Sequence, residues 1–235
     1  MAINYKDIIP WGRSFDEYIK MFSLTSEDIN LKILDCGGGP SSFNAEANKR
    51  GKTVISIDPI YNLSADVIEM RINETYDDVI NQTRVNADKF IWHNISSVEE
   101  LGRIRMAAIK QFLNDFEQGK IERRYISAEL PSLPFNDKEF DIALSSHFLF
   151  LYSSNLSLDF HRKAINEMVR VAREIRIFPL VSVNADPSPY VEHIKKELKN
   201  KGYKIAIEKV DYEFQKGGNE MFKISKEELG SGLHP

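Results

Sequence analysis

The chain has 235 residues, 42% of them hydrophobic, which is enough for one large domain or two small ones with a full core. The formal net charge is −4 with acids and bases interleaved, which argues against the concentrated basic face of a nucleic-acid-binding protein. The single cysteine, Cys36, excludes a disulfide within the chain, and we interpret it as a buried packing residue. The sequence shows no signal-peptide pattern and no apolar run of membrane-spanning length, so we expect a cytoplasmic protein with no membrane partner.

Residues 1–30 are expected to form an N-terminal helical cap. Ser14 is a favourable N-cap residue. The apolar positions that follow recur at helical spacing: Phe15, Tyr18, Ile19 and Phe22. The helix either covers one edge of the core or closes over a ligand site, in which case Arg13 or Tyr18 would reach the ligand.

A glycine-rich stretch then organises the chain. A short apolar run ends in Asp35, and a helical window begins at Phe43, which predicts a buried strand, a tight loop and a helix. The loop has three consecutive glycines: Gly37, Gly38 and Gly39. Glycine accepts a positive φ and lets a ligand approach the backbone, and unpaired N–H groups at the helix start favour a polar or anionic group. A dinucleotide site would need a third spaced glycine, where Ser42 stands.

A second β-rich run, 53–57, ends in Asp58, which lies 21 residues after Gly37 (58 − 37). A carboxylate at the end of the second strand, about 20 residues past the glycines, can accept hydrogen bonds from both hydroxyls of a ribose. This arrangement predicts a nucleoside ligand without choosing between a nicotinamide dinucleotide and S-adenosylmethionine (SAM).

Residues 59–123 contain no alternating strand pattern, and we predict a helical insertion there. Three windows have helical character: Asp66–Ile72, Glu74–Val85 and Glu99–Phe116. In the last window, apolar residues recur at helical spacing from Leu101 to Phe116. The insertion serves either as a lid over the site or as a buttress for the fold.

Two motifs resemble class I SAM-dependent methyltransferases. The pattern Asp35-x-Gly37-x-Gly39 is similar to the family's first motif, with Ser41 in place of an optional third glycine. After a predicted third strand over 125–128, the segment Leu-Pro-Phe-Asn-Asp-x-x-Phe-Asp over 133–141 resembles a further family motif.

The resemblance implies a SAM cofactor, with the glycine loop facing its methionine part and Asp58 on its ribose. The family usually has an acid for the adenine amino group where Ser127 stands. Ser127, Ala128 or the backbone near Glu129 would then replace that contact.

The C-terminal half predicts the remaining elements of the sheet. Strands, helices and a turn follow in the order strand 139–146, helix 156–172, strand 174–181, helix 189–201, strand 203–214, turn 216–219 and strand 220–225. Residues 226–235 are expected to be a tail. A closing antiparallel hairpin is typical of class I methyltransferases, whereas a dinucleotide fold ends on parallel strands. We therefore predict one α/β domain over 1–235: a Rossmann-like, doubly wound, seven-stranded sheet, mostly parallel, with a C-terminal antiparallel hairpin and a helical insertion.

Ser145, Ser146 and His147 lie at the end of the fourth strand, where parallel strands present their ligand site. His147 is a candidate general base and equally a candidate packing residue. The branch of the family that methylates amino groups of nucleic-acid bases has Asn/Asp-Pro-Pro-Tyr/Phe there, so Ser-Ser-His-Phe argues against that activity and against a nucleic-acid partner.

The sequence thus predicts a SAM-dependent methyltransferase with a small-molecule acceptor and no metal, and with Arg13, Asp35 and Ser145 among its cofactor contacts. Two alternatives stay open. One is a non-catalytic nucleoside- or SAM-binding regulatory protein. The other is an NAD(P)-dependent oxidoreductase, which Ser42 and the terminal hairpin disfavour. We also expect Gly38 to tolerate alanine better than Gly39 tolerates valine.

Overall fold

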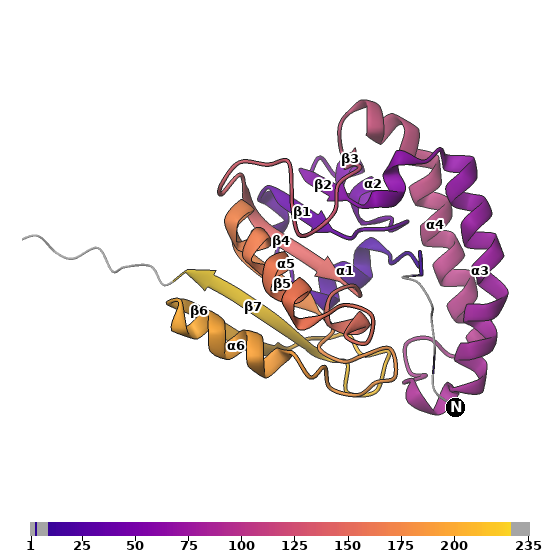
Figure 1. Ribbon diagram of the computed structural model, residues 1–235. Helices are drawn as coiled ribbons and strands as arrows, with labels where there is room; N and C mark the ends of the chain where they lie inside the picture. Colours follow the sequence, from indigo (N-terminus) through magenta and orange to yellow (C-terminus); the bar gives the residue numbers. More distant parts are fainter. Residues whose placement is uncertain (1–2, 4–8, 227–235) are drawn as a thin grey trace, which may run out of the picture.

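The computed structural model describes residue 3 and residues 9–226, and it centres on one seven-stranded sheet (Figure 1). The strands stand in the order β3-β2-β1-β4-β5-β7-β6. Their bounds are β1 Ile33–Cys36, β2 Val54–Ile57, β3 Tyr125–Ile126, β4 Phe140–Ser146, β5 Ala172–Phe178, β6 Tyr203–Lys209 and β7 Glu220–Lys226. The first five strands run parallel, and β7 pairs antiparallel with both β5 and β6. This arrangement confirms the predicted Rossmann-like methyltransferase fold.

Helices cover both faces of the sheet. The α-helices are α1 Phe15–Met21, α2 Phe43–Lys49, α3 Ala65–Val85, α4 Val98–Ile121, α5 Leu158–Val171 and α6 Val191–Asn200. Four 3₁₀ turns are η1 Asp28–Asn30, η2 Pro59–Asn62, η3 Ala87–Lys89 and η4 Phe150–Tyr152. Apolar residues of α5 and α6 pack on one face of the sheet, and those of α1 and α2 pack on the other. None of the helices in the described part of the chain is long and apolar enough to cross a membrane.

The first helix begins where the sequence predicts. Ser14 accepts a hydrogen bond from the Glu17 N–H, and the Glu17 carboxylate accepts one from the Ser14 N–H, which completes a capping box. Tyr18 and Phe43 then stack with ring centroids 4.3 Å apart, so α1 is fixed against α2 directly behind the glycine loop.

Two long helices, α3 and α4, lie side by side along one edge of the molecule (Figure 1). The two windows predicted before and after residue 73 form one continuous helix, because Asn73 neither lacks a backbone N–H nor breaks the apolar stripe that includes Ile72 and Val79. The pair buries its shared apolar face against the β3 edge of the sheet, where Phe112 and Tyr125 meet edge to face.

Several strand bounds differ from the prediction. β3 has two residues instead of four, and β5 ends at Phe178, before Pro179, which has no N–H for the strand ladder. β6 ends at Lys209, and the loop 210–219 then leaves the sheet to contact the insertion. There, the Ile91 N–H donates to the Phe214 carbonyl at 2.7 Å. The predicted tail falls almost entirely on residues 227–235, which lie outside the described residues.

Candidate functional site

A cavity of about 660 Å³ opens at the carboxyl ends of the parallel strands, where α/β sheets bind their ligands. Of the residues that the sequence predicts for the site, ten line it: Arg13, Tyr18, Gly37, Gly38, Gly39, Asp58, Ala128, Glu129, Ser146 and His147. From these strand ends the cavity extends to α3, α4 and the loop 210–219. It is therefore large enough in principle for a cofactor and a second small molecule.

Glycine is required for different structural reasons at the three positions of the loop. Gly37 and Gly39 have positive φ angles of +70° and +53°, which side chains rarely adopt. At Gly39 an added Cβ would meet only the Asp58 carboxylate, at 3.9 Å. At Gly38 an added Cβ would lie 2.4 Å from the Asp35 carboxylate, so the expectation that Gly38 tolerates alanine is wrong.

The backbone N–H groups of the glycine loop are already paired. Those of Gly37 and Gly38 donate to the Ile57 carbonyl at 2.9 and 3.1 Å. The Gly39 N–H donates to the Asp58 carboxylate at 3.0 Å. The loop is thereby tied to the end of β2.

The first N–H groups around the start of α2 are paired as well. The Ser42 N–H donates to the Arg13 carbonyl at 3.0 Å, and the Phe43 N–H donates to Ser41 Oγ at 3.1 Å. Our expectation of unpaired donors here is therefore wrong for these groups. A pyrophosphate would therefore find no free backbone N–H donors among these groups.

Asp58 stands between the glycine loop and η2. Its Oδ2 accepts the Gly39 N–H and its Oδ1 accepts the Ile60 N–H, each at 3.0 Å. Burial raises the pKa of this carboxyl to about 6, although the two N–H donors oppose the shift. A carboxylate has about four lone-pair positions, so two remain for hydroxyl donors from the cavity.

Asp35, contrary to prediction, does not line the cavity. Its carboxyl is buried behind the loop, where it accepts hydrogen bonds from the Tyr18 hydroxyl at 3.1 Å and the Ser56 hydroxyl at 3.0 Å. Burial raises its pKa to about 7. The residue thus holds α1 and β2 together behind the site.

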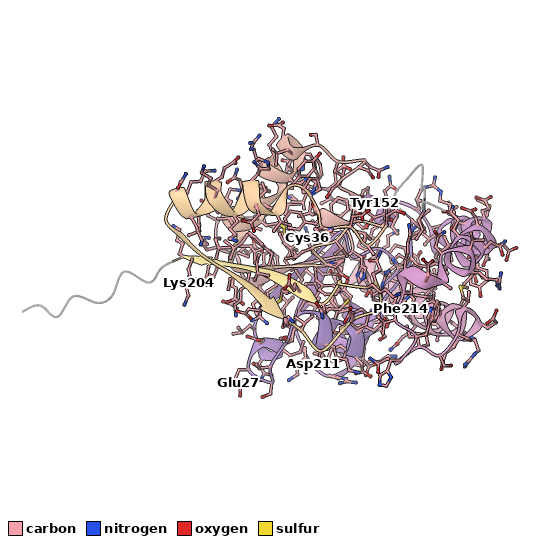
Figure 2. All side chains as sticks on the ribbon, turned by 90° about the horizontal axis from the view of Figure 1, so that it is seen from below. Glu27, Cys36, Tyr152, Lys204, Asp211 and Phe214 are labelled. Carbon is pink, nitrogen blue, oxygen red and sulfur yellow. The ribbon has the colours of Figure 1, made fainter. Side chains whose placement is uncertain are left out.

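Two further predicted contacts also lie outside the cavity lining. Ser145 is fully buried within β4, and Ser127 is exposed to solvent just after β3 ends at Ile126. Ala128 lines the cavity, as does Glu129 beside it. Figure 2 shows Cys36 deep inside the molecule, and its complete burial agrees with the packing role predicted for it.

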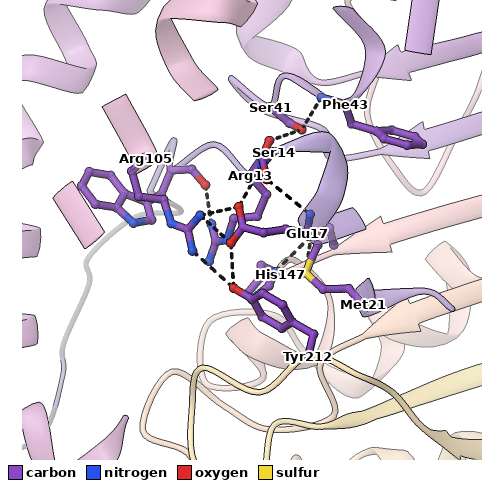
Figure 3. A network of polar contacts seen from close by, with 11 residues as sticks. Arg13, Ser14, Glu17, Met21, Ser41, Phe43, Arg105, His147 and Tyr212 are labelled. Carbon is purple, nitrogen blue, oxygen red and sulfur yellow. Dashed lines mark hydrogen bonds and ion pairs between the residues drawn. The ribbon is translucent and has the colours of Figure 1, made fainter. Parts of the chain in front are cut away.

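A buried polar network lies behind one wall of the cavity, which its member Arg105 lines (Figure 3). Arg105 Nη1 donates to both Glu17 oxygens at 2.7 Å, and Arg105 Nη2 donates to the Tyr212 hydroxyl at 3.3 Å. The Tyr212 hydroxyl donates to Glu17 Oε1 at 2.8 Å. Burial alone would raise the pKa of Glu17, but the charge and hydrogen bonds of Arg105 lower it to about 2. Glu17 is therefore ionised, and its carboxylate oxygens are occupied by Arg105, Tyr212 and the Ser14 N–H.

Arg13 lies beside this network and has no carboxylate partner among the described residues. Its Nη1 donates to the Trp11 carbonyl, while its Nε is buried without a hydrogen-bond partner. Arg105 Nε is orphaned in the same way. Burial, and then the charge of Arg105, lower the pKa of Arg13. Of these two neighbouring guanidinium groups, only Arg105 is hydrogen-bonded to the Glu17 carboxylate.

His147 follows β4 in the left-handed conformation, with φ +51°. Its N–H donates to the Phe178 carbonyl at 2.7 Å, and its Nδ1 lies 3.0 Å from Ser146 Oγ. Burial, then the charges of Arg13 and Arg105, hold its pKa well below the ordinary value, so the ring is neutral near neutral pH. A strained backbone at a cavity-lining residue is typical of functional sites.

Sequence reasoning missed Arg105, Tyr212 and the role of Glu17. Arg105 carried a usable signal, because it stands one helical turn after Leu101 and within the apolar stripe of α4. A charged residue on a buried helix face needs a partner or a function. Tyr212 gave no such signal, since it lies in a loop that tertiary contacts alone bring to the site.

Comparison with known proteins places the chain in a family. No protein-family model matches it. The uncharacterized protein MJ0045 of Methanocaldococcus jannaschii is 39% identical over 225 residues, which cover 95% of this chain and 99% of that protein. The chain belongs to the MJ0045 family. The family is therefore defined by sequence, while its activity must be argued from the site.

Solved structures with related folds are far more distant from this MJ0045-family chain. Magnesium protoporphyrin IX methyltransferase of Synechocystis PCC 6803, solved with bound SAM, is 11% identical with a TM-score of 0.47, covering 90% of this chain and 77% of that one. A putative SAM-dependent methyltransferase of Methanococcus maripaludis is 12% identical with a TM-score of 0.47, covering 92% and 85%. Similarity at this level does not identify a ligand or acceptor for the MJ0045 family.

Proposed function

We propose that this chain is a SAM-dependent methyltransferase acting on a small-molecule acceptor. The observation that carries the proposal is the placement of Gly39, Asp58 and Arg13 around one cavity at the carboxyl ends of the strands. The three supply a close approach to the backbone, a ribose acceptor and a cation. This set matches the parts of an amino-acid-bearing nucleoside.

The residues fit such a cofactor on structural grounds. The Asp58 carboxylate keeps two lone-pair positions toward the cavity for the ribose hydroxyls. The space in front of Gly39 would be filled by any side chain larger than hydrogen. Arg13 Nε, buried and without a partner, would donate to the carboxylate of the methionine part. Apolar lining at Ile57 and Leu130 would pack beside the adenine ring.

When bound, SAM supplies an electrophilic methyl group that an acceptor lone pair attacks as the bond from sulfur to that carbon breaks. The chain's own task is then to align the acceptor and to take any proton that the acceptor loses. In the tautomer whose Nδ1–H donates to Ser146 Oγ, the free lone pair of His147 is on Nε2. His147 is neutral and lines the cavity, so we assign it the role of general base for an acceptor with a dissociable proton; burial and the charges of Arg13 and Arg105 make it a weak one.

The nicotinamide alternative finds less support in the site. A dinucleotide pyrophosphate binds to free N–H groups of the glycine loop and the helix that follows. Here Gly37, Gly38, Gly39 and Ser42 all direct theirs to acceptors of the chain itself.

Two titrations and one transfer assay test the proposal. Calorimetry on the full chain should detect binding of S-adenosylhomocysteine and none of NADH. Incubation with SAM labelled in the methyl group and a library of metabolites should then label one class of compound. Binding of NADH in preference to S-adenosylhomocysteine would overturn the assignment. Tight binding of S-adenosylhomocysteine with no transfer to any compound would favour the regulatory protein.

A further inference from the structure

Beyond the end that we assign to the nucleoside, the cavity continues into a mostly apolar end. On α3, Val79 and Thr83 lie one turn apart and both line it, and on α4, Leu101 and Arg105 do the same. Phe214 closes this end from the loop 210–219, and Figure 2 shows it on the side of the molecule where the insertion helices lie. A ligand bound here would contact hydrocarbon on several sides.

A single cation interrupts this apolar lining. Arg105 is fully buried, lines the cavity and has an Nε without a hydrogen-bond partner. Its carboxylate partner, Glu17, already accepts hydrogen bonds from Arg105, Tyr212 and the Ser14 N–H, so it cannot neutralise Arg13 as well. Arg105 keeps Glu17 as its counter-ion, but its buried Nε–H has no acceptor in the described part of the chain, which favours a ligand that brings one.

Among the described residues, none of the other charged groups that line the cavity accepts a hydrogen bond from Arg105 Nε. Arg71 and Glu74 on α3 have opposite charges, and Asp58 and Glu129 lie at the β2 and β3 ends of the cavity. With the methionine carboxylate on Arg13, the zwitterionic part of SAM is balanced internally and its sulfonium adds a further positive charge. The positive sulfonium and the vacant Arg105 Nε–H therefore favour an anionic acceptor over a cationic one.

We propose that the methyl acceptor is an apolar small molecule bearing a carboxylate, which Arg105 binds while Val79, Leu101 and Phe214 pack around its hydrocarbon body. This proposal rests on the proposed function. Two observations support it: Arg105 Nε has no hydrogen-bond partner, and Leu101, one helical turn away on the same face of α4, gives the cavity an apolar lining. Guanidinium binds carboxylate through paired N–H donors, which gives orientation as well as affinity.

The test compares 4-phenylbutyrate with its neutral amide, titrated into the full chain with and without saturating S-adenosylhomocysteine. We expect the acid to bind at least about tenfold more tightly than the amide in both conditions, which is what one charge-assisted hydrogen bond is worth. Arg105→Met alone would leave Glu17 buried and unpaired, so the informative variant combines Arg105→Met with Glu17→Gln. Its folding is checked by thermal melting.

In the double variant the preference for the acid should disappear while binding of the amide persists. The matched control is Arg103→Gln, which removes an exposed arginine from the same helix and should keep the preference. Equal binding of acid and amide, binding of neither, or a preference that survives in the double variant would overturn the proposal. Loss of acid binding when S-adenosylhomocysteine is present would overturn it too, because Arg105 would then serve the cofactor carboxylate.

These outcomes are separable from the failure of the proposed function. That function fails if S-adenosylhomocysteine does not bind in the absence of either compound. The comparison of acid with amide in the cofactor-free chain still reports on Arg105 in that case.

Discussion

Replacing Asp58 with alanine removes the group on which the nucleoside assignment depends most. The carboxylate accepts the Gly39 and Ile60 N–H groups and keeps two lone-pair positions for ribose hydroxyls. A hydrogen bond to a charged group contributes about 1.5–3 kcal/mol, so two of them set an upper limit of about 3–6 kcal/mol. Water that enters the vacated space recovers part of this. We therefore expect S-adenosylhomocysteine to bind about 10- to 150-fold more weakly to Asp58→Ala, or about 1.5–3 kcal/mol.

Calorimetric titration measures this change directly. Glu69→Ala is the matched control, because it removes a carboxylate from an exposed position on α3 outside the cavity lining. The control should bind as the natural chain does. If Asp58→Ala binds S-adenosylhomocysteine within about twofold of the natural chain, the carboxylate does not hold the ribose and the nucleoside assignment is refuted.

The pH dependence of S-adenosylhomocysteine binding tests the role of Asp58 a second time. Burial raises the pKa of the Asp58 carboxyl to about 6 in the free chain. Ribose hydroxyls donate to the ionised form, so protons compete with the ligand and affinity should fall as the pH decreases through about 6. In Asp58→Asn, which does not titrate, this part of the pH dependence should be absent. An identical pH profile in both proteins would contradict the role.

Further predictions concern the loop, the first arginine and the buried acid. Gly38→Ala should lower the melting temperature, because its Cβ would lie 2.4 Å from the Asp35 carboxylate, and an unchanged melting temperature would contradict this geometry. Gly39→Val is strained at φ +53° and should melt at a lower temperature too, but it should keep a cooperative melt and lose S-adenosylhomocysteine in titrations. Binding as tight as that of the natural chain would show that the loop does not face the ligand. Arg13→Met should weaken binding of S-adenosylhomocysteine but not of methylthioadenosine, which lacks the amino-acid part, and an equal loss for both would place Arg13 elsewhere. The pKa of Asp35 is raised to about 7 from 3.8, so its contribution to stability is present at low pH and is lost as pH rises through about 7. Asp35→Asn should therefore lose less stability than the natural chain between about pH 5 and pH 8 in chemical denaturation, and parallel curves would refute the assignment.

Short sequence motifs were sufficient to predict the strands and the loop that surround the site. A short apolar strand ending in glycines, a second strand ending in Asp58 and a terminal turn signal each depend on residues close together in the sequence. Their chemistry follows from backbone rules that hold in any context, such as positive φ at glycine. For this reason the mostly parallel sheet with its closing hairpin, the glycine loop and the position of Asp58 at the end of the second strand could be predicted before the structure was known.

The sequence by itself could not decide which side chains at those strand ends face the ligand. Asp35 turns to Tyr18 and Ser56, and Ser145 packs inside, because helices cover both faces of the sheet and consecutive residues of β1 and β4 are buried whichever face they point to.

Only the tertiary structure decided the polar wall of the cavity. Arg105 and Glu17 are 88 residues apart, and Tyr212 and Glu17 are 195 apart, yet their side chains meet in one network. Hydrophobic periodicity tells which face of an element is buried, but it carries no information about which distant element will cover that face. The arginine that we assign to the acceptor therefore became interpretable only once folding had placed the insertion, the first helix and the C-terminal loop around the same space.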